Sequence, residues 1–476
     1  MSLLTAQRSS DWIACIDFGT ALSKMAMVRR MPRSQLCGSD VMPLAVGARQ
    51  DVAAKNPLLL PSIVYITDEE RILFGDEAQV AAGRGEWLGR QAFASPKQYL
   101  STRELEELDE PLEVGIDPTG KYTPRDLLAL FLAHLLAQAA GAAAASNLPW
   151  PVPLRIARPA WESRRAIDGE ETLKNLLLQG FAIADELGSK LTAADGVADS
   201  DAFIALSNAQ NDERLRDSAF CRHVFELNAH GSASVLEATA AAAGSIRDAG
   251  RRVVAVADIG GGTSDFGAFL TGLPGHDALA EIRGSSHILR EAGDHLDTLL
   301  TRHILEKAGV DAEDPAGKRA ARHLRRNQRA YKERLFAAGR LHLKFDDDVE
   351  SVTLDAFLQD PQVQAFAERL RSKFHNALTA AVECARQYSQ ADDSGRIPVE
   401  ILLTGGGHAL PMVKELASRP SVEWTYTDAA PEIPDGPVSE DFRIVRRQLA
   451  VAIGGAIRDL PRTTAPVWFA PSGRGR

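Results

Sequence analysis

Residues 253–270 read VVAVADIGGGTSDFGAFL, and this stretch decides which fold the sequence encodes. A short apolar run ends in an acidic residue, Asp258, which is followed by an isoleucine, three glycines and a threonine. A second apolar run begins soon afterwards at Phe266. Short apolar runs bounded by glycine are typical of buried strands, so the stretch predicts a β-hairpin with a glycine-rich tip.

The same pattern occurs near the start of the chain, where residues 12–28 read WIACIDFGTALSKMAMV. Here the apolar run ends at Asp17, the turn contains Gly19 and Thr20, and the return run begins at Lys24. A third apolar run, residues 399–403, leads into three further glycines at 405–407. Two similar hairpins about half the chain apart predict a duplicated α/β fold with two lobes.

Both turns have the chemistry that a phosphate chain requires. Glycine lets backbone N–H groups approach phosphate oxygens, because a Cβ would stand in the way. An Asp before each turn can hold Mg²⁺ mainly through water, since this ion gives up its water reluctantly. Asp17 and Asp258 are therefore expected on opposite walls of one triphosphate site. A P-loop is excluded because GxxxxGK[ST] is absent, and residues 260–262 lack the GxGxxG spacing of a dinucleotide fold.

Composition narrows the class of protein further. The chain has 476 residues, 45% of them hydrophobic, and a net charge of −10, which disfavours a nucleic-acid partner. The four cysteines form no CxxC, so we expect no zinc, no disulfide framework and a reducing, cytoplasmic setting. No signal peptide is evident. Residues 127–145 contain His134 and Gln138, which favours a buried amphipathic helix over a membrane span.

Weaker signals lie between the hairpins. Thr123 and Pro124 have the pattern of a helix N-cap and first turn, and residues 235–244 predict an alanine-rich helix ending at glycine. Residues 31–60 are expected to form a long loop, and residues 189–230 give no clear pattern. The basic run from 318 to 334 predicts a solvated helix face, with a partner-docking face as the alternative.

The three glycine turns resemble the two phosphate motifs and the adenosine motif of the actin-like ATPase superfamily. Within it, the chain is most similar to the nucleotide-binding part of the DnaK-type 70-kilodalton heat-shock chaperones. The similarity spans roughly residues 11–460 in order. It is carried by residues 60–64, 74–78, 93–97, 122–124, 156–161, 237–242, 293–297, 405–411 and 452–457.

The resemblance implies an actin-like ATPase fold, in which two duplicated RNase H-like lobes enclose a nucleotide cleft. Lobe I would comprise residues 11–248, completed by about 438–460, and lobe II would comprise residues 249–437. Residues 461–476 are rich in Pro and Gly and are expected to be partly disordered. Because the similarity ends near residue 460, we expect no counterpart of the chaperones' peptide-binding domain.

The same resemblance implies a site for ATP or ADP with Mg²⁺. Asp17 and Asp258 would orient Mg²⁺ and its water, Lys97 would contact the γ-phosphate and the attacking water, and Glu237 would place metal-bound water. The remaining nucleotide contacts would come from Gly19, Thr20, Gly260, Gly261, Gly262, Thr263, Asp265, Gly293, Asp294, Gly405 and Gly406. The simpler alternatives are a surface lysine at 97, a helix-terminal carboxylate at 237 and a structural acceptor at 265.

The sequence also departs from the chaperone pattern. Ala21 stands where a second threonine is usual, Ala409 stands where an arginine is usual near the adenine, and residues 332–334 match an adenosine-binding pattern only partly. We therefore predict a slowly ATP-hydrolysing switch or chaperone-like factor that binds a protein partner, and neither nucleic acid nor membrane. The alternative is a non-hydrolysing nucleotide-dependent binding module. A small-molecule kinase and a filament-forming protein of the same fold are further possibilities.

Overall fold

The computed structural model describes residues 3, 5–47, 56–85, 89–101, 103–159, 161, 163–217, 222–228, 231–245, 253–271, 280–311, 314–345, 348–387, 397–418, 424–429 and 439–463. Over these residues the chain is a mixed α/β protein with two large sheets and two small ones. The α/β class predicted from the sequence is thereby confirmed. The predicted tail from residue 464 onwards, and Ala160 within the segment 156–161, lie outside the described residues.

The first large sheet is built around the N-terminal hairpin. Its strands are β1 (Trp12–Asp17), β2 (Leu22–Arg29), β3 (Val41–Pro43), β4 (Leu60–Pro61), β8 (Leu154–Arg158) and β10 (Ser234–Leu236). The order is β10-β8-β1-β2-β3, with β4 also paired to β2. β1 and β2 are antiparallel, with Asp17 opposite Lys24, whereas β8 runs parallel to β1, and β10 parallel to β8. β1 is central and buried along its whole length, which accounts for its apolar run from Trp12 to Ile16.

The second large sheet repeats this plan. Its strands are β11 (Val253–Ile259), β12 (Ser264–Leu270), β13 (Ala280–Glu281), β14 (His287–Leu289), β17 (Ile397–Thr404), β18 (Trp424–Ala429) and β19 (Arg462–Thr463). The order is β18-β17-β11-β12-β13-β19, with β14 also paired to β12. β11 and β12 are antiparallel, and β17 and β18 continue in parallel from β11. Both predicted hairpins are therefore confirmed, and each is flanked by two parallel strands on the same side.

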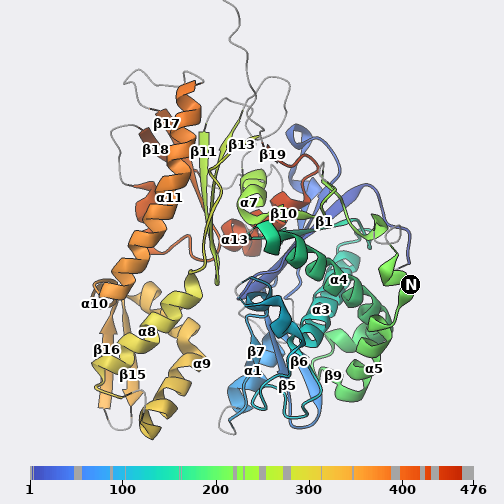
Figure 1. The fold of residues 1–476 in the computed structure, drawn as a ribbon, viewed down its shortest axis with the longest axis horizontal. Coiled ribbons are helices and arrows are strands. Elements are labelled where there is room, and N and C mark those ends of the chain that lie inside the picture. The colour runs from blue at the N-terminus through green and yellow to red at the C-terminus, as the bar shows by residue number, and fades with distance from the viewer. Residues whose placement is uncertain are drawn as a thin grey trace, which may run out of the picture.

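Helices and a small sheet complete the first half of the chain, at the right of Figure 1. They are α1 (Gly75–Gly85), α2 (Lys97–Ser101), α3 (Pro124–Ala145), α4 (Ser163–Leu187), α5 (Asp199–Gln210), β5 (Ile63–Ile66), β6 (Arg71–Phe74), β7 (Phe93–Ala94) and β9 (Val197–Ala198). The ranges 31–60 and 189–230 therefore contain short regular elements among their loops. Short 3₁₀ turns lie at Arg33–Gln35, Gly38–Asp40, Leu105–Asp109, Gly188–Thr192, Glu213–Arg216 and Glu415–Ala417.

Helix α3 begins as predicted, because Thr123 accepts a hydrogen bond from the Asp126 N–H in a capping box. The predicted amphipathic character is wrong for its first half, since every residue from Leu127 to Leu136 is buried. By length and composition α3 could cross a membrane, yet 67% of its most apolar stretch is buried inside the protein. This burial identifies it as a core helix in the fold described here.

Two helices, α7 (Glu237–Ser245) and α13 (Glu440–Ala456), pack against each other between the large sheets (Figure 1). α7 follows strand β10 of the first sheet but packs on β11 and β12, whereas α13 follows β18 of the second sheet but packs on β1 and β2. The helix predicted from residue 235 begins at Glu237 instead, because Ser234–Leu236 pairs with β8 as an edge strand.

The second half of the chain lies at the left of Figure 1. It contains α8 (Gly293–Lys307), α9 (Pro315–Ala338), α10 (Leu354–Leu358), α11 (Pro361–Gln387), α12 (Pro411–Lys414), and the small sheet of β15 (Arg340–Phe345) with β16 (Asp348–Thr353). Separate apolar clusters fill the first half, the second half and the region around α7 and α13. The predicted lobe limits stay a prediction.

Candidate functional site

A cleft of about 540 Å³ lies between the two halves of the chain, at the tips of the two hairpins. This volume is in the range of small-molecule binding sites. The residues predicted from the sequence that line it are Asp17, Gly19, Thr20, Lys97, Glu237, Asp258, Gly260, Gly261, Thr263, Gly293, Asp294, Gly405 and Gly406. They are spread over most of the sequence, and the fold brings them together.

Gly262 and Asp265 do not line this cleft. A Cβ added to Gly262 would lie 2.7 Å from Thr20 Oγ1, and one added to Gly261 would lie 3.1 Å from the Ala21 Cβ. The tips of the two hairpins are therefore in close approach, which the small side chain of Ala21 permits. Asp265 lies opposite Asp258 on β12 and is buried.

On the first hairpin, Asp17 forms an ion pair. Lys24 lies directly opposite it on β2, and Lys24 Nζ is 2.6 Å from Asp17 Oδ2. Both side chains are largely buried, with 12% of Lys24 and 6% of Asp17 exposed, and both line the cleft. The negative charge of Asp17 in the cleft wall is therefore balanced by Lys24.

On the second hairpin, the environment of Asp258 is different. Thr404, its neighbour on the parallel strand β17, donates a hydrogen bond of 2.9 Å to Asp258 Oδ1. Burial, together with the negative charges of Glu237 and Asp17, raises the pKa of Asp258 to about 7, against a partly compensating effect of Lys24. Asp258 is thus a carboxyl that changes its protonation near neutral pH, which is common at functional sites.

A second ion pair spans the cleft floor. Lys97, the first residue of α2, donates to Glu237, the first residue of α7, and both are buried. Burial acts to lower the pKa of Lys97, but the carboxylates of Glu237, Asp17 and Asp265 together raise it above the ordinary value. Because Lys97 is buried, its interpretation as an ordinary surface lysine is wrong.

The N-terminus of α8 closes over the glycine turn of the second hairpin. The N–H of Gly293 donates to Gly260 O at 3.2 Å, and the N–H of Asp294 donates to Gly261 O at 2.8 Å. From the other half of the chain, Gln98 Nε2 donates to Asp294 Oδ2 at 3.3 Å. Burial raises the pKa of Asp294. The hydrogen bond from Gln98 to Asp294 therefore connects the two walls of the cleft.

In the third glycine turn, after β17, Gly405 and Gly406 have different surroundings. Gly405 has a φ of +77°, and a Cβ there would lie 2.3 Å from Ile259 O and 2.7 Å from Asp258 Oδ1. Gly406 lines the cleft, and a Cβ there would meet no protein atom within 4 Å. The turn therefore packs its backbone against Asp258 and leaves room for a ligand beside it.

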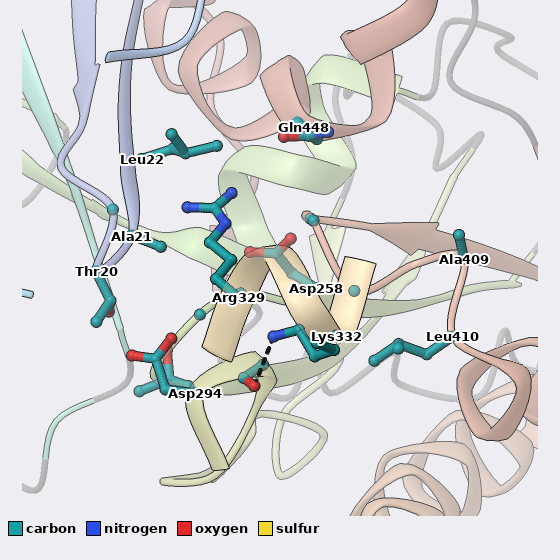
Figure 2. Close-up of a pocket in the computed structure, with 18 of the residues that line it drawn as sticks. Thr20, Ala21, Leu22, Asp258, Asp294, Arg329, Lys332, Ala409, Leu410 and Gln448 are labelled. Carbon is teal, nitrogen blue, oxygen red and sulfur yellow. Dashed lines mark hydrogen bonds between the residues drawn. The ribbon is translucent and has the colours of Figure 1, made fainter. Parts of the chain in front are cut away.

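Helix α9 lines the cleft both with residues that sequence reasoning missed, such as Arg329 and Phe336, and with Lys332 and Glu333 of the partly matching adenosine pattern. Arg329, Lys332, Glu333 and Phe336 line the cleft from one face of this helix. Arg329 and Lys332 are labelled in Figure 2. The spacing of three or four residues along α9 was the available signal. Part of the basic run thus faces the cleft, which corrects the prediction of a wholly solvated helix face.

Lys332 is held in place by hydrogen bonds to Gly293 O at 2.7 Å and to Asp297 Oδ2 at 2.9 Å. Burial raises the pKa of Asp297, whereas the positive charge of Lys332 acts to lower it. The remaining lining residues outside the predicted set are Ala21, Leu22, Lys24, Asp297, Ala337, Gly407, Ala409, Leu410, Pro411, Lys414 and Gln448. In Figure 2, Leu22 and Ala21 lie on one side of the pocket and Ala409 and Leu410 on the other.

Among the described residues, no three His, Cys, Asp or Glu side chains converge as a direct metal-ligand set. A metal ion held mainly through water needs no such cluster, and Asp17 and Asp258 both reach the cleft as oxygen donors. The open space at Gly406 and the facing glycine turns fit a phosphate chain. The residues present are therefore compatible with a nucleotide and a water-bound Mg²⁺.

No protein-family model and no curated protein sequence matches this chain.

Proposed function

We propose that this protein binds ATP and hydrolyses it slowly, as a nucleotide-driven switch of the actin-like ATPase fold related to the DnaK-type chaperones. The observation that carries the proposal is the convergence of two acid-tipped hairpins, from sheets with the same strand order, on one cleft. Tight turns in unrelated sheets would not be expected to share a pocket or to repeat a topology.

The repeated strand order supports the proposed fold. In each large sheet an antiparallel hairpin is followed by two parallel strands on the same side, as expected for duplicated RNase H-like lobes. In each case the acid lies at or next to the end of the first strand, so its side chain reaches the same edge of the sheet. Duplication gives one cleft two similar walls.

The glycine turns would hold the phosphate chain through backbone N–H groups. The first turn offers Gly19 and Thr20, and the second offers Gly260 to Thr263, all at or beside the cleft. Asp17 and Asp258 would hold Mg²⁺ mainly through water, and the ion would supply positive charge against the charge that develops on the phosphates. The glycines matter because a Cβ at these points would meet the protein's own atoms, 2.0 Å from Leu22 O at Gly19 and 2.7 Å from Thr20 Oγ1 at Gly262, so only glycine lets the two tips approach this closely.

Hydrolysis would proceed by in-line attack of water on the γ-phosphate, with positioning and charge neutralisation supplying most of the catalysis. Lys97 would stabilise charge on the transferred group, since its pairing with Glu237 keeps the amine protonated in a buried position. Asp258 would orient the attacking water, and a carboxyl with a pKa of about 7 can accept its proton near neutral pH.

Magnesium-dependent ATP turnover by the pure protein tests this proposal. We expect Asp17→Asn and Lys97→Ala each to reduce turnover by about 100-fold, the usual effect of removing one charge-stabilising group. Matched control variants are Asp195→Asn and Lys190→Ala, which change surface residues in exposed ion pairs. These controls should keep wild-type turnover.

Calorimetric titration with ADP would establish whether each variant is folded and binds the nucleotide. If both site variants retain full turnover while binding ADP normally, the assignment of the site is wrong. The same titration separates the second candidate function, a binding module that holds its two halves closed around a nucleotide without hydrolysing it. Tight binding without turnover would favour that module, which the engagement of Asp17 by Lys24 makes worth testing.

We further propose a cytoplasmic location and a protein partner, with no role for nucleic acid, membrane or zinc. The described cysteines, Cys15, Cys37 and Cys384, are all free thiols, and Cys37 is exposed, which suits a reducing compartment. The two walls of the cleft are linked by the hydrogen bond between Gln98 and Asp294. Hydrolysis of a nucleotide in the cleft would change the contacts between the walls and so the relative position of the two halves. A protein partner would bind to surfaces that move in this way.

A further inference from the structure

Lys24 is a cation built into the wall of the cleft. It lies on β2 opposite Asp17, its amine is 2.6 Å from the Asp17 carboxylate, and 12% of its side chain is exposed. It also lines the same cleft as Asp258. The amine is thus bonded to one of the two acids proposed to face a bound metal ion and shares the cleft with the other.

The second hairpin has no such cation at the corresponding position. The residue opposite Asp258 is Asp265, which is separated from it by the same number of residues as Lys24 is from Asp17. The two hairpins therefore share backbone register and differ in charge at this point. A lysine here is a property of the first wall alone.

The difference in charge between the two hairpins becomes important when a negatively charged nucleotide binds. A phosphate chain brings several negative charges into a cleft already lined by Asp17, Glu237 and Asp258. A divalent ion ordinarily balances such charges. An ammonium group has three donors, so Lys24 can keep its bond to Asp17 and still donate to a phosphate oxygen.

We propose that Lys24 acts as a permanent cation of the phosphate site, so that nucleotide binding depends only weakly on a divalent metal ion. This inference rests on the proposed nucleotide site. Lys24 shares the role with Lys97, which is buried against Glu237 on the cleft floor. Its pairing with Asp17 also leaves that carboxylate less available to the water shell of a metal ion.

Calorimetric titration with ADP, in excess Mg²⁺ and in excess EDTA, tests the inference. For the wild-type protein we expect the dissociation constant to rise less than about tenfold when the metal is removed. For Lys24→Met the same removal should weaken binding by a further factor of about 10–100, the effect of losing one charged hydrogen bond. Lys24→Arg keeps the charge and should resemble the wild type.

Lys190→Met is the matched control, because Lys190 also pairs with an aspartate, Asp201 at 2.7 Å, but at the surface. It should leave both dissociation constants unchanged. Binding in Mg²⁺ shows that Lys24→Met is folded. An equal metal dependence in wild type and Lys24→Met would overturn the inference while leaving the nucleotide site intact. A wild-type protein that binds neither ADP nor ATP would overturn the inference together with the proposed function.

Discussion

The two hairpins of this molecule have nearly the same backbone and opposite electrostatics. Each has an acid at or next to the end of its first strand, a glycine turn and a return strand in the same register. On the first, Asp17 faces Lys24 and forms an ion pair, whereas on the second, Asp258 faces Asp265 and its pKa is raised to about 7. The negative charge of Asp17 is balanced by Lys24 within the protein, whereas the charged form of Asp258 would be stabilised by a bound cation.

This difference shows how two hairpins with the same strand pairing can carry different charges at corresponding positions. The same strand pairing places the two acids, but the charged groups around each acid decide what it can do: Lys24 for Asp17, and Glu237 with Asp17 for Asp258. A balanced carboxylate can position a neighbour without attracting a proton. An unbalanced, buried one costs free energy until a cation or a proton arrives.

The largest expected effect comes from breaking the balanced wall. Asp17→Asn leaves the ammonium group of Lys24 largely buried without its partner, and should lower the free energy of unfolding by about 3 kcal/mol. Urea unfolding of the nucleotide-free protein measures this. The double variant Asp17→Asn/Lys24→Met should recover most of the loss, because both charges are gone. A double variant no more stable than Asp17→Asn would show that the pair has no such energetic coupling.

The second hairpin should make the stability of the folded protein depend on pH, through Asp258. With a pKa of about 7 in the folded protein and 3.8 as its ordinary value, Asp258 binds more protons folded than unfolded between those values. Its contribution to stability is therefore present at low pH and is lost as pH rises through 7. Between pH 5 and 8 we expect a loss of about 2–3 kcal/mol from this group.

Asp258→Asn should remove that part of the pH dependence, since the amide does not titrate. Urea unfolding at pH 5 and pH 8, with Asp195→Asn as the surface control, measures the difference. At pH 8 the nucleotide-free Asp258→Asn protein should be more stable than the wild type, the reverse of the Asp17→Asn result. Equal pH slopes in wild type and Asp258→Asn would contradict the raised pKa.

A smaller effect is expected from a second difference between the halves, which is the way that the corresponding strands β17 and β8 end. Strand β17 ends in the glycine turn against Asp258, while its counterpart β8 ends at Arg158 and a proline. Gly405→Ala should cost about 2 kcal/mol, since it strains a left-handed residue and pushes a Cβ against Ile259 O. Gly309→Ala has a similar φ of +63° with open space around it, so it should cost only the strain of about 1 kcal/mol. Nucleotide affinity should fall for Gly405→Ala alone.

Much of the fold could be predicted from local patterns. The hairpins follow from apolar runs broken by glycine, and the start of α3 follows from Thr123 and Pro124. Strand β10 could not be found this way, because Ser234–Leu236 is short and merges into an alanine-rich helix. Its strand identity comes from pairing with β8, which is a long-range contact.

The candidate site was predictable where chemistry and spacing coincide, as in the residues around Asp17 and Asp258. The role of Lys24 in the cleft was missed because a lysine in a strand has no signature of its own, and only the register places it opposite an acid. The cleft-facing side of α9 was predicted only in part, through residues 332–334, for a related reason. Arg329 and Lys332 belong to a run of basic residues, and only packing decides which of them face inward.

The crossing of α7 and α13 has a mechanical consequence. A Cβ on Gly454 would lie 1.7 Å from Ala240 O, and one on Gly244 would lie 2.2 Å from Ala450 O, so the two backbones touch. Each helix is tethered by sequence to one sheet and packed on the other. The two halves are therefore joined through this helix contact, which is buried together with apolar side chains of α13 such as Leu449 and Ile453, and they cannot separate without breaking it. If the two sides of the cleft move relative to each other, the contact between α7 and α13 is the point about which they would turn.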